Sequence, residues 1–213
     1  MSGLNEPQQQ AVDYIDGPLL VLAGAGSGKT KVITEKIAQL IRTKKFQPEQ
    51  IAAITFTNKA AREMRERVGK RISRAAAEAL TVTTFHSLGL KFLQEECKQV
   101  GLRRGFSIFD SDDQQGLIKD LLPPGADKDA LYAAQGWISK VKNRALSPEQ
   151  AQEHAKTLRE KDIAKLYARY QGRLQTFNPV DFDDVIRLPL QVLESDAEAR
   201  TRWQAKIRYL LVD

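Results

Sequence analysis

The chain has 213 residues, of which 42% are hydrophobic and 28% charged, and its 33 Lys and Arg residues outnumber 27 Asp and Glu residues to give a formal net charge of +6. This composition is ordinary for a soluble globular protein of one or two domains. The positive charge permits a polyanionic partner without requiring one.

Several classes of protein are excluded by the same survey. The longest apolar run, GPLLVLAGAG at residues 17–26, is too short to cross a bilayer, so no membrane partner is expected. The N-terminus lacks the basic cluster and apolar stretch of a signal peptide. Cys97 is the single cysteine, which excludes an internal disulfide and favours a reducing cytoplasm. We interpret it as a buried, unreactive thiol.

The first part of the chain alternates strand and helix patterns. Residues 19–23 (LLVLA), 51–56 (IAAITF) and 81–85 (TVTTF) read as buried parallel strands, and RYLLVD at residues 208–213 reads as a fourth. Apolar residues at helical spacing follow the first strand: Ile33, Ile37, Leu40 and Ile41. A second helix follows the next strand, with Asn58 suited to cap it. The pattern predicts an α/β sheet covered by helices.

The middle of the chain is helical. Residues 89–178 carry almost no strand signal, and possible capping boxes occur at Ser111 with Gln114 and at Ser147 with Gln150. We therefore predict a first part of an α/β lobe at residues 1–88, an inserted helical subdomain at 89–196, and a return to the lobe at 197–213.

A phosphate-binding loop is predicted at residues 23–30, AGAGSGKT, because this stretch follows a strand pattern and opens a helix. Small residues let backbone N–H groups surround phosphates at the positive end of the helix dipole. Lys29 would reach the outer phosphates and the Thr30 hydroxyl would bind Mg²⁺. Ala23 occupies the position of the first glycine of the strict pattern. The alternative is a glycine-rich turn with no ligand.

The terminal Asp213 is a second candidate for the metal. It ends an apolar strand, and ligands of open α/β sheets collect at the carboxyl ends of the strands. An acidic residue in this position of a phosphate-loop fold holds Mg²⁺ directly or through water. Asp213 is therefore predicted to face the Lys29 loop.

Seven segments in order carry a family resemblance: LNEPQQQAV, AGAGSGKT, ITFTNKAAREMRERV, TTFHSLG, FSIFDSDDQ, VDFDD and LLVD. The series resembles superfamily 1 DNA helicases of the UvrD/PcrA/Rep group, most closely the Rep branch, over essentially the whole chain. The resemblance implies a RecA-like motor lobe with an inserted helical subdomain. It also implies ATP and Mg²⁺ as cofactors, and 3′-to-5′ movement on single-stranded DNA and at single/double-strand junctions. A role in replication, with replication proteins as partners, is implied as well.

The resemblance also assigns residues to roles. Lys29 and Asp213 are implied as catalytic residues, Thr30 and Asp213 as metal ligands, and Gln8 as the reader of adenine. The implied nucleotide contacts are Gln8, Ala23, Gly24, Ala25, Gly26, Ser27, Gly28, Lys29, Thr30 and Lys31. Relatives often carry an arginine that packs on the base where this chain has Lys31, and an ammonium stacks less well than a guanidinium. The implied DNA contacts are Phe56, Thr57, Asn58, Lys59, Thr84, Phe85 and His86.

The resemblance places the chain at the first of two motor lobes. The family continues with E-x-Q-D after the aspartate, including the base that activates water, and none of these residues is present. We therefore expect the chain to bind nucleotide and DNA weakly, with little turnover. Two rivals stay open: another phosphate-loop enzyme such as a small-molecule kinase, and a nucleotide-gated single-strand DNA-binding module without catalysis.

Other charged groups have both a structural and a functional interpretation. A basic run is either a solvated helix face or a phosphate-binding surface: Lys59, Arg62, Arg65, Arg67, Lys70, Arg71 and Arg74. Lys140, Lys142 and Arg144 are a second candidate for DNA backbone contact. Asp181, Asp183 and Asp184 suit a helix N-terminus better than a metal site. His154 is expected at the surface.

Overall fold

A computed structural model describes residues 3–213, and the chain divides into two compact units. Unit 1 comprises Met1–Leu88 and Arg200–Asp213, and unit 2 comprises Gly89–Ala199. The first division lies where the sequence predicted it, and the second lies three residues later than the predicted end at 196. No helix in the described part of the chain combines the length and apolar character needed to cross a membrane.

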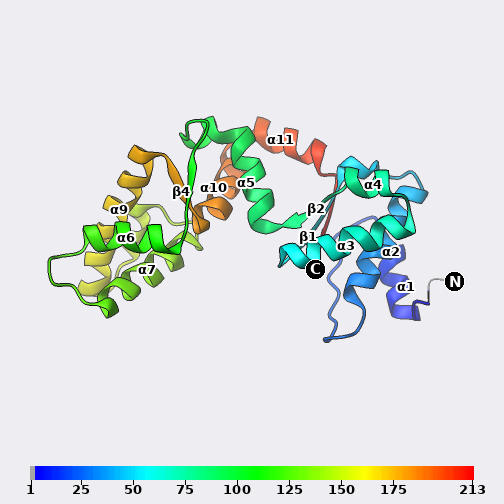
Figure 1. Ribbon diagram of the computed structural model, residues 1–213, viewed down its shortest axis with the longest axis horizontal. Coiled ribbons are helices and arrows are strands. Elements are labelled where there is room, and N and C mark those ends of the chain that lie inside the picture. Colours follow the sequence, from blue (N-terminus) through cyan, green and yellow to red (C-terminus); the bar gives the residue numbers. More distant parts are fainter. Residues whose placement is uncertain (1–2) are drawn as a thin grey trace. The chain divides into compact units, whose positions relative to one another are not determined.

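Unit 1 is built on a parallel sheet of β1 (Ile51–Thr55), β2 (Thr81–Thr84) and β5 (Tyr209–Val212), in the order β2-β1-β5 (Figure 1). The central strand β1 is buried along its whole length, which explains its unbroken apolar sequence. Ala53 pairs with Val82 on one side and with Leu211 on the other. The α/β fold and three of the four predicted strands are thereby confirmed.

The helices of unit 1 pack on this sheet through a continuous apolar core. Ile37 and Leu40 of one helix, Met64 and Val68 of another, and Ile51 of β1 are fully buried in it. The elements are α1 (Glu6–Asp13), α2 (Lys29–Arg42), the short 3₁₀ helix η1 (Pro48–Gln50), α3 (Asn58–Arg71) and α4 (Arg74–Ala79). Thr57, one residue before the predicted Asn58, caps α3 by accepting a hydrogen bond from the backbone N–H of Ala60.

The strand predicted at residues 19–23 is wrong for this structure. The segment has no regular secondary structure and joins no sheet among the described residues, and Leu20 and Leu22 are 82% and 88% exposed. An apolar run becomes a strand only where a neighbouring strand accepts its backbone hydrogen bonds. The segment instead lines a cavity of about 830 Å³ together with Leu210 and Val212 of β5.

Unit 2 is mostly helical, as predicted. Its one small sheet pairs β3 (Ser107–Phe109) with β4 (Pro179–Asp181) in parallel. The helices are α6 (Ser111–Leu121), α7 (Lys128–Lys142), α8 (Pro148–His154), α9 (Leu158–Phe177) and α10 (Phe182–Ser195). α5 (Phe85–Glu96), followed by η2 (Cys97–Val100), carries the chain into the unit, and α11 (Ala197–Lys206) carries it back.

The ends of these helices follow standard capping chemistry. The capping box at Ser147 and Gln150 is confirmed, with Pro148 in the first turn of α8. In α6 the box is formed by Asp110 and Asp113, one residue earlier than the predicted Ser111 and Gln114.

The core of unit 2 is tightly packed. Tyr167 and Tyr170 of α9 are fully buried beside Ile118 and Ile138 of α6 and α7. The buried thiol of Cys97 agrees with its structural interpretation.

Candidate nucleotide and DNA site

The predicted phosphate loop leads directly into α2 and needs glycine at two positions. Gly26 and Gly28 have φ values of +74° and +86°, in the left-handed region that favours glycine. A Cβ atom on Gly28 would also lie 3.1 Å from Nε2 of Gln8. Residues 23–27 are exposed to solvent, although the Ser27 N–H donates to the Gly24 carbonyl at 3.3 Å and would have to exchange this partner for an anion.

Lys29 lies over this loop with only neutral partners. Its Nζ donates hydrogen bonds to the carbonyl oxygens of Gly24 at 2.8 Å and Ala23 at 3.3 Å, and no described carboxylate pairs with it. The Ser27 hydroxyl donates to the same Gly24 oxygen at 2.7 Å. An exposed ammonium held by carbonyl groups can exchange them for phosphate oxygens, which are stronger acceptors.

Asp213 reaches the start of α2. Its backbone N–H continues the β1–β5 pairing by donating to Ile54 at 2.8 Å. Its Oδ2 accepts a hydrogen bond of 3.1 Å from Oγ1 of Thr30, although the two residues are 183 positions apart in sequence. A hydroxyl and a carboxylate side by side form a set of hard oxygen donors, which is the set that Mg²⁺ prefers. The residues present therefore fit the expected metal.

Gln8 and Lys31 lie on the other side of the loop. The Gln8 side chain donates from Nε2 to the Ser27 carbonyl at 2.8 Å and accepts at Oε1 from the Asn5 N–H at 3.0 Å. An amide has two donors and two acceptor positions, so one of each stays available. Lys31 donates to the Gly3 carbonyl at 2.8 Å. The structure thus gathers the predicted nucleotide contacts around residues 23–31.

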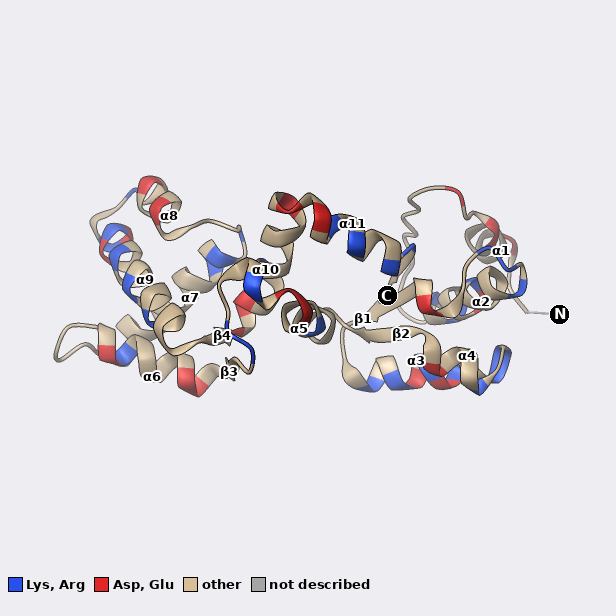
Figure 2. Ribbon diagram, turned by 90° about the horizontal axis from the view of Figure 1, so that it is seen from above, with Lys and Arg blue, Asp and Glu red and all other residues tan. Residues whose placement is uncertain are grey.

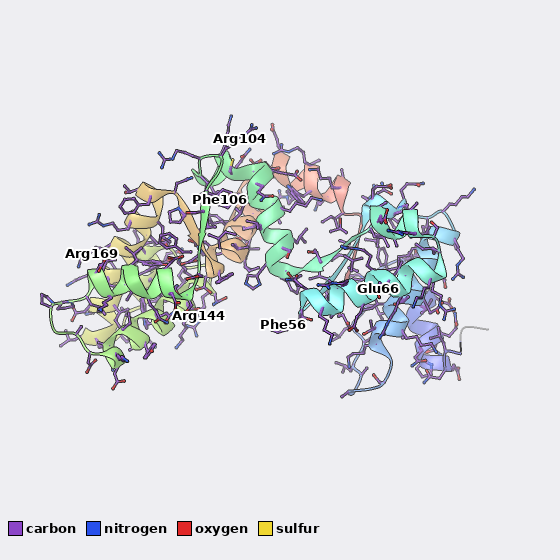
Figure 3. The ribbon with its side chains drawn as sticks, in the orientation of Figure 1. Phe56, Glu66, Arg104, Phe106, Arg144 and Arg169 are labelled. Atoms are coloured by element: carbon purple, nitrogen blue, oxygen red, sulfur yellow. The ribbon has the colours of Figure 1, made fainter. Side chains whose placement is uncertain are left out.

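The first predicted DNA-contact segment follows β1 at the same edge of the sheet as Asp213. Phe56 is 91% exposed, beside the ribbon where β1 leads into α3 (Figure 3), so it is not a core residue. Asn58 and Lys59 are exposed as well. The Thr57 hydroxyl is engaged in capping α3, so this residue fixes the loop as well as lying in it.

The second predicted segment is only partly presented to solvent. Phe85 is about half exposed and His86 is exposed. Thr84 is buried, and its hydroxyl donates to Ser87 Oγ at 3.0 Å and accepts from the Ser87 N–H at 3.2 Å. The prediction that the Thr84 side chain contacts DNA is therefore wrong. This side chain caps the start of α5 instead.

The basic run on α3 contains both structural residues and candidates for phosphate contact. Arg65 donates to the Val82 carbonyl at 2.6 Å, and Arg71 pairs with the buried Glu35 at 2.7 Å, so these two arginines brace the helix. The other cations of the run are exposed, and Figure 2 shows Lys and Arg segments recurring along α3. Of these, Arg67 and Arg74 pair with Glu63 and Glu78, so Lys59, Arg62 and Lys70 are the better candidates for contact with a phosphate backbone.

In unit 2 the prediction of DNA contact by Lys142 is wrong. Its side chain is fully buried and pairs with Asp181 at 2.6 Å and with Asp184 at 2.9 Å. Tyr170 also donates to Asp181, at 2.8 Å. Burial, followed by the negative charge of Asp181, raises the pKa of Tyr170 above its ordinary value. Lys140 and Arg144 are exposed, as the prediction requires.

The carboxylates of VDFDD open α10, as predicted. Asp181 caps the helix by accepting from the Asp184 N–H at 2.9 Å. No cluster of metal-ligating side chains occurs in the part of the chain that the structure describes, here or elsewhere. His154 is exposed and its ring lies 2.7 Å from the Gln150 carbonyl, in agreement with a surface role.

Sequence reasoning missed one residue of this region, Lys36 of α2. It is 5% exposed and donates to the carbonyl oxygens of Ala11, at 2.7 Å, and Tyr14. A signal was present, because position 36 shares the apolar face of Ile33 and Leu40 at helical spacing.

Comparison with known proteins agrees with this geometry. The model of the UvrD/REP helicase N-terminal domain matches residues 4–213. The chain is 49% identical to ATP-dependent DNA helicase Rep of Escherichia coli K12, over 99% of the chain and 32% of that protein. It is 39% identical to ATP-dependent DNA helicase PcrA of Leuconostoc citreum, over 100% of the chain and 29% of that protein. The chain therefore spans about a third of these relatives' length.

Proposed function

The chain belongs to the UvrD/REP helicase family, and on that premise we propose that the intact protein is an ATP-dependent helicase that moves 3′ to 5′ along single-stranded DNA. We further propose that it acts in replication, in the cytoplasm. One observation carries the nucleotide part of this proposal: the Thr30 hydroxyl and the Asp213 carboxylate meet at 3.1 Å beside the Lys29 loop.

In this proposal different residues of unit 1 bind the phosphates, the metal ion and the base of the nucleotide. The N–H groups of residues 23–28 and the Lys29 ammonium bind the phosphates, and Thr30 and Asp213 hold Mg²⁺. The ion, when bound, neutralises charge that develops on the transferred phosphoryl group. Gln8 offers its remaining amide donor and acceptor to the base, as an adenine edge requires.

The DNA track in this proposal runs over the loops that follow β1 and β2. Phe56 stacks on a base, and base stacking is independent of sequence, as movement along any strand requires. Lys59, His86 and the exposed cations of α3 lie close in sequence to these loops and contact phosphates. Such contacts carry no sequence information and weaken with salt.

The test is the ATPase rate of the full-length protein with and without single-stranded DNA. A helicase is expected to hydrolyse ATP faster with the DNA, and equal rates would favour another phosphate-loop enzyme such as a small-molecule kinase. Directionality is read from displacement of a labelled strand next to a 3′ or a 5′ single-stranded tail.

We expect little turnover from the 213-residue chain alone, since the described residues supply phosphate and metal contacts without an identified base for the attacking water. Titration of this chain with single-stranded DNA at several salt concentrations, with and without ATP, tests the rival of a complete binding module. Nanomolar affinity would support that rival, and weak, salt-sensitive affinity supports a motor lobe.

A further inference from the structure

Lys36 is a buried cation for which the proposed mechanism has no use. Its ammonium donates to two backbone carbonyls, those of Ala11 and Tyr14, and forms no ion pair with any described carboxylate. Burial lowers the pKa of Lys36, and the charge of Asp13 offsets part of that effect. A buried charge with neutral partners is expensive, so an apolar residue would serve better if packing were the only requirement.

The two carbonyls that Lys36 holds lie at the C-terminal end of α1. The last carbonyls of a helix have no partner within the helix and carry the negative end of its dipole, and a lysine satisfies both conditions. Gln39, one turn further along α2, donates to Asp13 at 3.0 Å and supports the same end. Lys36 and Gln39 therefore hold the end of α1 against α2.

α1 depends on such contacts because it is only eight residues long. Isolated helices of this length are marginal in water. Its apolar contact is small, with Ala11 and Val12 packed against Val32. Releasing one end would therefore let the helix shift.

A shift of α1 would move Gln8. Gln8 lies one turn before Ala11, and its Nε2 is 2.8 Å from the Ser27 carbonyl and 3.1 Å from the Cβ position of Gly28. The Gln8 amide is therefore in direct contact with the rim of the phosphate loop. Lys36 itself lies roughly 10 Å along α2 from Lys29. Its ammonium also lies 5.9 Å from the ring centroid of Tyr209 in β5, but its hydrogen bonds go to the end of α1.

We propose that Lys36 is a positioning residue for base selection, which anchors the C-terminal end of α1 on α2 so that Gln8 meets the edge of the nucleotide base. This inference rests on the proposed function only in that Gln8 reads the base. If Lys36 has this role, selectivity for adenine depends on the contacts between α1 and α2, whereas phosphate binding depends on residues 23–30.

The test is competition binding to the full-length protein, with a fluorescent ATP analogue displaced by ATP, GTP or inorganic tripolyphosphate. Lys36→Met keeps the length of the side chain and removes its donors. We expect its affinity for ATP to fall about tenfold, which corresponds to the loss of about one neutral hydrogen bond between Gln8 and the base. Its preference for ATP over GTP should fall with it, and its affinity for tripolyphosphate should stay unchanged.

Three variants serve as controls. Lys36→Arg retains donors and should restore the ATP preference. Lys45→Met removes an exposed lysine that pairs with Asp16 and should change nothing. Gln39→Ala weakens the same end of α1 and should shift the preference in the same direction by a smaller factor, which keeps the test valid if Lys36→Met fails to fold.

A double variant separates positioning from general damage. Gln8→Ala should lose the ATP preference, and adding Lys36→Met should cause no further loss. Parallel losses for ATP, GTP and tripolyphosphate, an unchanged ATP preference in Lys36→Met, or additive losses in the double variant would each overturn the proposal. Because the readout is binding, absence of DNA-stimulated hydrolysis would reject the helicase proposal and leave this test intact.

Discussion

Two sets of lysine and aspartate residues, one in each unit, have opposite environments. In unit 2, Lys142 is fully buried, its partners Asp181 and Asp184 have 2% and 4% exposed side chains, and both hydrogen bonds of its ammonium are ion pairs. In unit 1, Lys29 and Asp213 are both exposed, and each is held by a neutral group.

The difference separates structural charge from functional charge. A buried pair is stable only when each charge is matched, and then no donor is left for a ligand. An exposed lysine on carbonyl groups stays available for exchange. Residue type and local pattern are alike in both places, so the burial of the partners identifies the role.

The largest effect is expected from breaking the buried set. Lys142→Met leaves Asp181 buried without a cation and Asp184 with Arg187 alone, and we expect the free energy of unfolding to fall by about 3–5 kcal/mol. Urea denaturation of the 213-residue chain measures it. The exposed neighbour Lys140→Met is the matched control, with an expected change below about 0.5 kcal/mol. Equal effects from the two variants would show that the buried set is not structural.

The exposed set should respond in activity and not in stability. Lys29→Ala removes one preorganised donor from the triphosphate, and we expect the DNA-stimulated ATPase rate of the full-length protein to fall about 10²–10³-fold. The thermal midpoint should stay at the wild-type value, because the side chain packs on no core residue. A lowered midpoint would place Lys29 with Lys142 among the structural lysines.

A smaller effect is expected at the DNA loop. Phe56→Ala should weaken single-strand binding by about 1–3 kcal/mol, the range of one base–aromatic stack, and leave unfolding unchanged. Phe46→Ala is the matched control, because its ring lies 5.3 Å from Tyr209 in the core of unit 1. Phe46→Ala should lower the free energy of unfolding and leave the DNA-contact residues intact. If Phe56→Ala unfolds the chain and Phe46→Ala weakens only DNA binding, Phe56 is the core residue and our assignment is wrong.

The smallest effect is a difference in alkaline stability between the units. Burial raises the pKa values of Tyr167 and Tyr170 above 10.0, the value for the unfolded chain. Stability from these tyrosines is complete below pH 10 and is lost as the pH rises further, because only the unfolded state releases the protons. At pH 10 the loss is about 0.4 kcal/mol per tyrosine.

The two tryptophans allow this loss to be assigned to a unit. Trp137 lies in unit 2 and Trp203 in unit 1, so single-tryptophan variants followed by fluorescence report each unit separately. Unit 2 should lose stability between pH 9 and 11 more steeply than unit 1, whose raised tyrosine Tyr209 is less buried. Identical profiles would contradict the assignment.

Much of the fold could be predicted because its signals are local. The helix N-terminus at Ser147 depends on neighbours within a few residues, and the sequences of β1 and β2 carry the apolar and β-branched residues typical of buried strands. The prediction of a strand at residues 19–23 failed because a strand also requires a neighbouring strand to pair with. The apolar pattern of one segment carries no information on whether that neighbour is present.

The site was predictable to the same degree. Lys29, Thr30 and Asp213 follow from a motif and from the topology of parallel sheets, so their convergence could be expected. Lys142 and Thr84 could not be assigned correctly, because whether a polar side chain faces solvent depends on segments far away in sequence. Lys142 meets acids 39 and 42 residues later.

The free edge of β5 has a practical consequence for work with the isolated chain. Leu210 and Val212 of this edge strand are about half exposed, and the exposed leucines of residues 19–22 line the same cavity. An unprotected apolar edge is a template for intermolecular β pairing, and a net charge of +6 opposes it only at low ionic strength. Colloidal stability will therefore worsen with added salt, so dilute, low-salt buffers suit storage, and gel filtration should precede any titration against DNA.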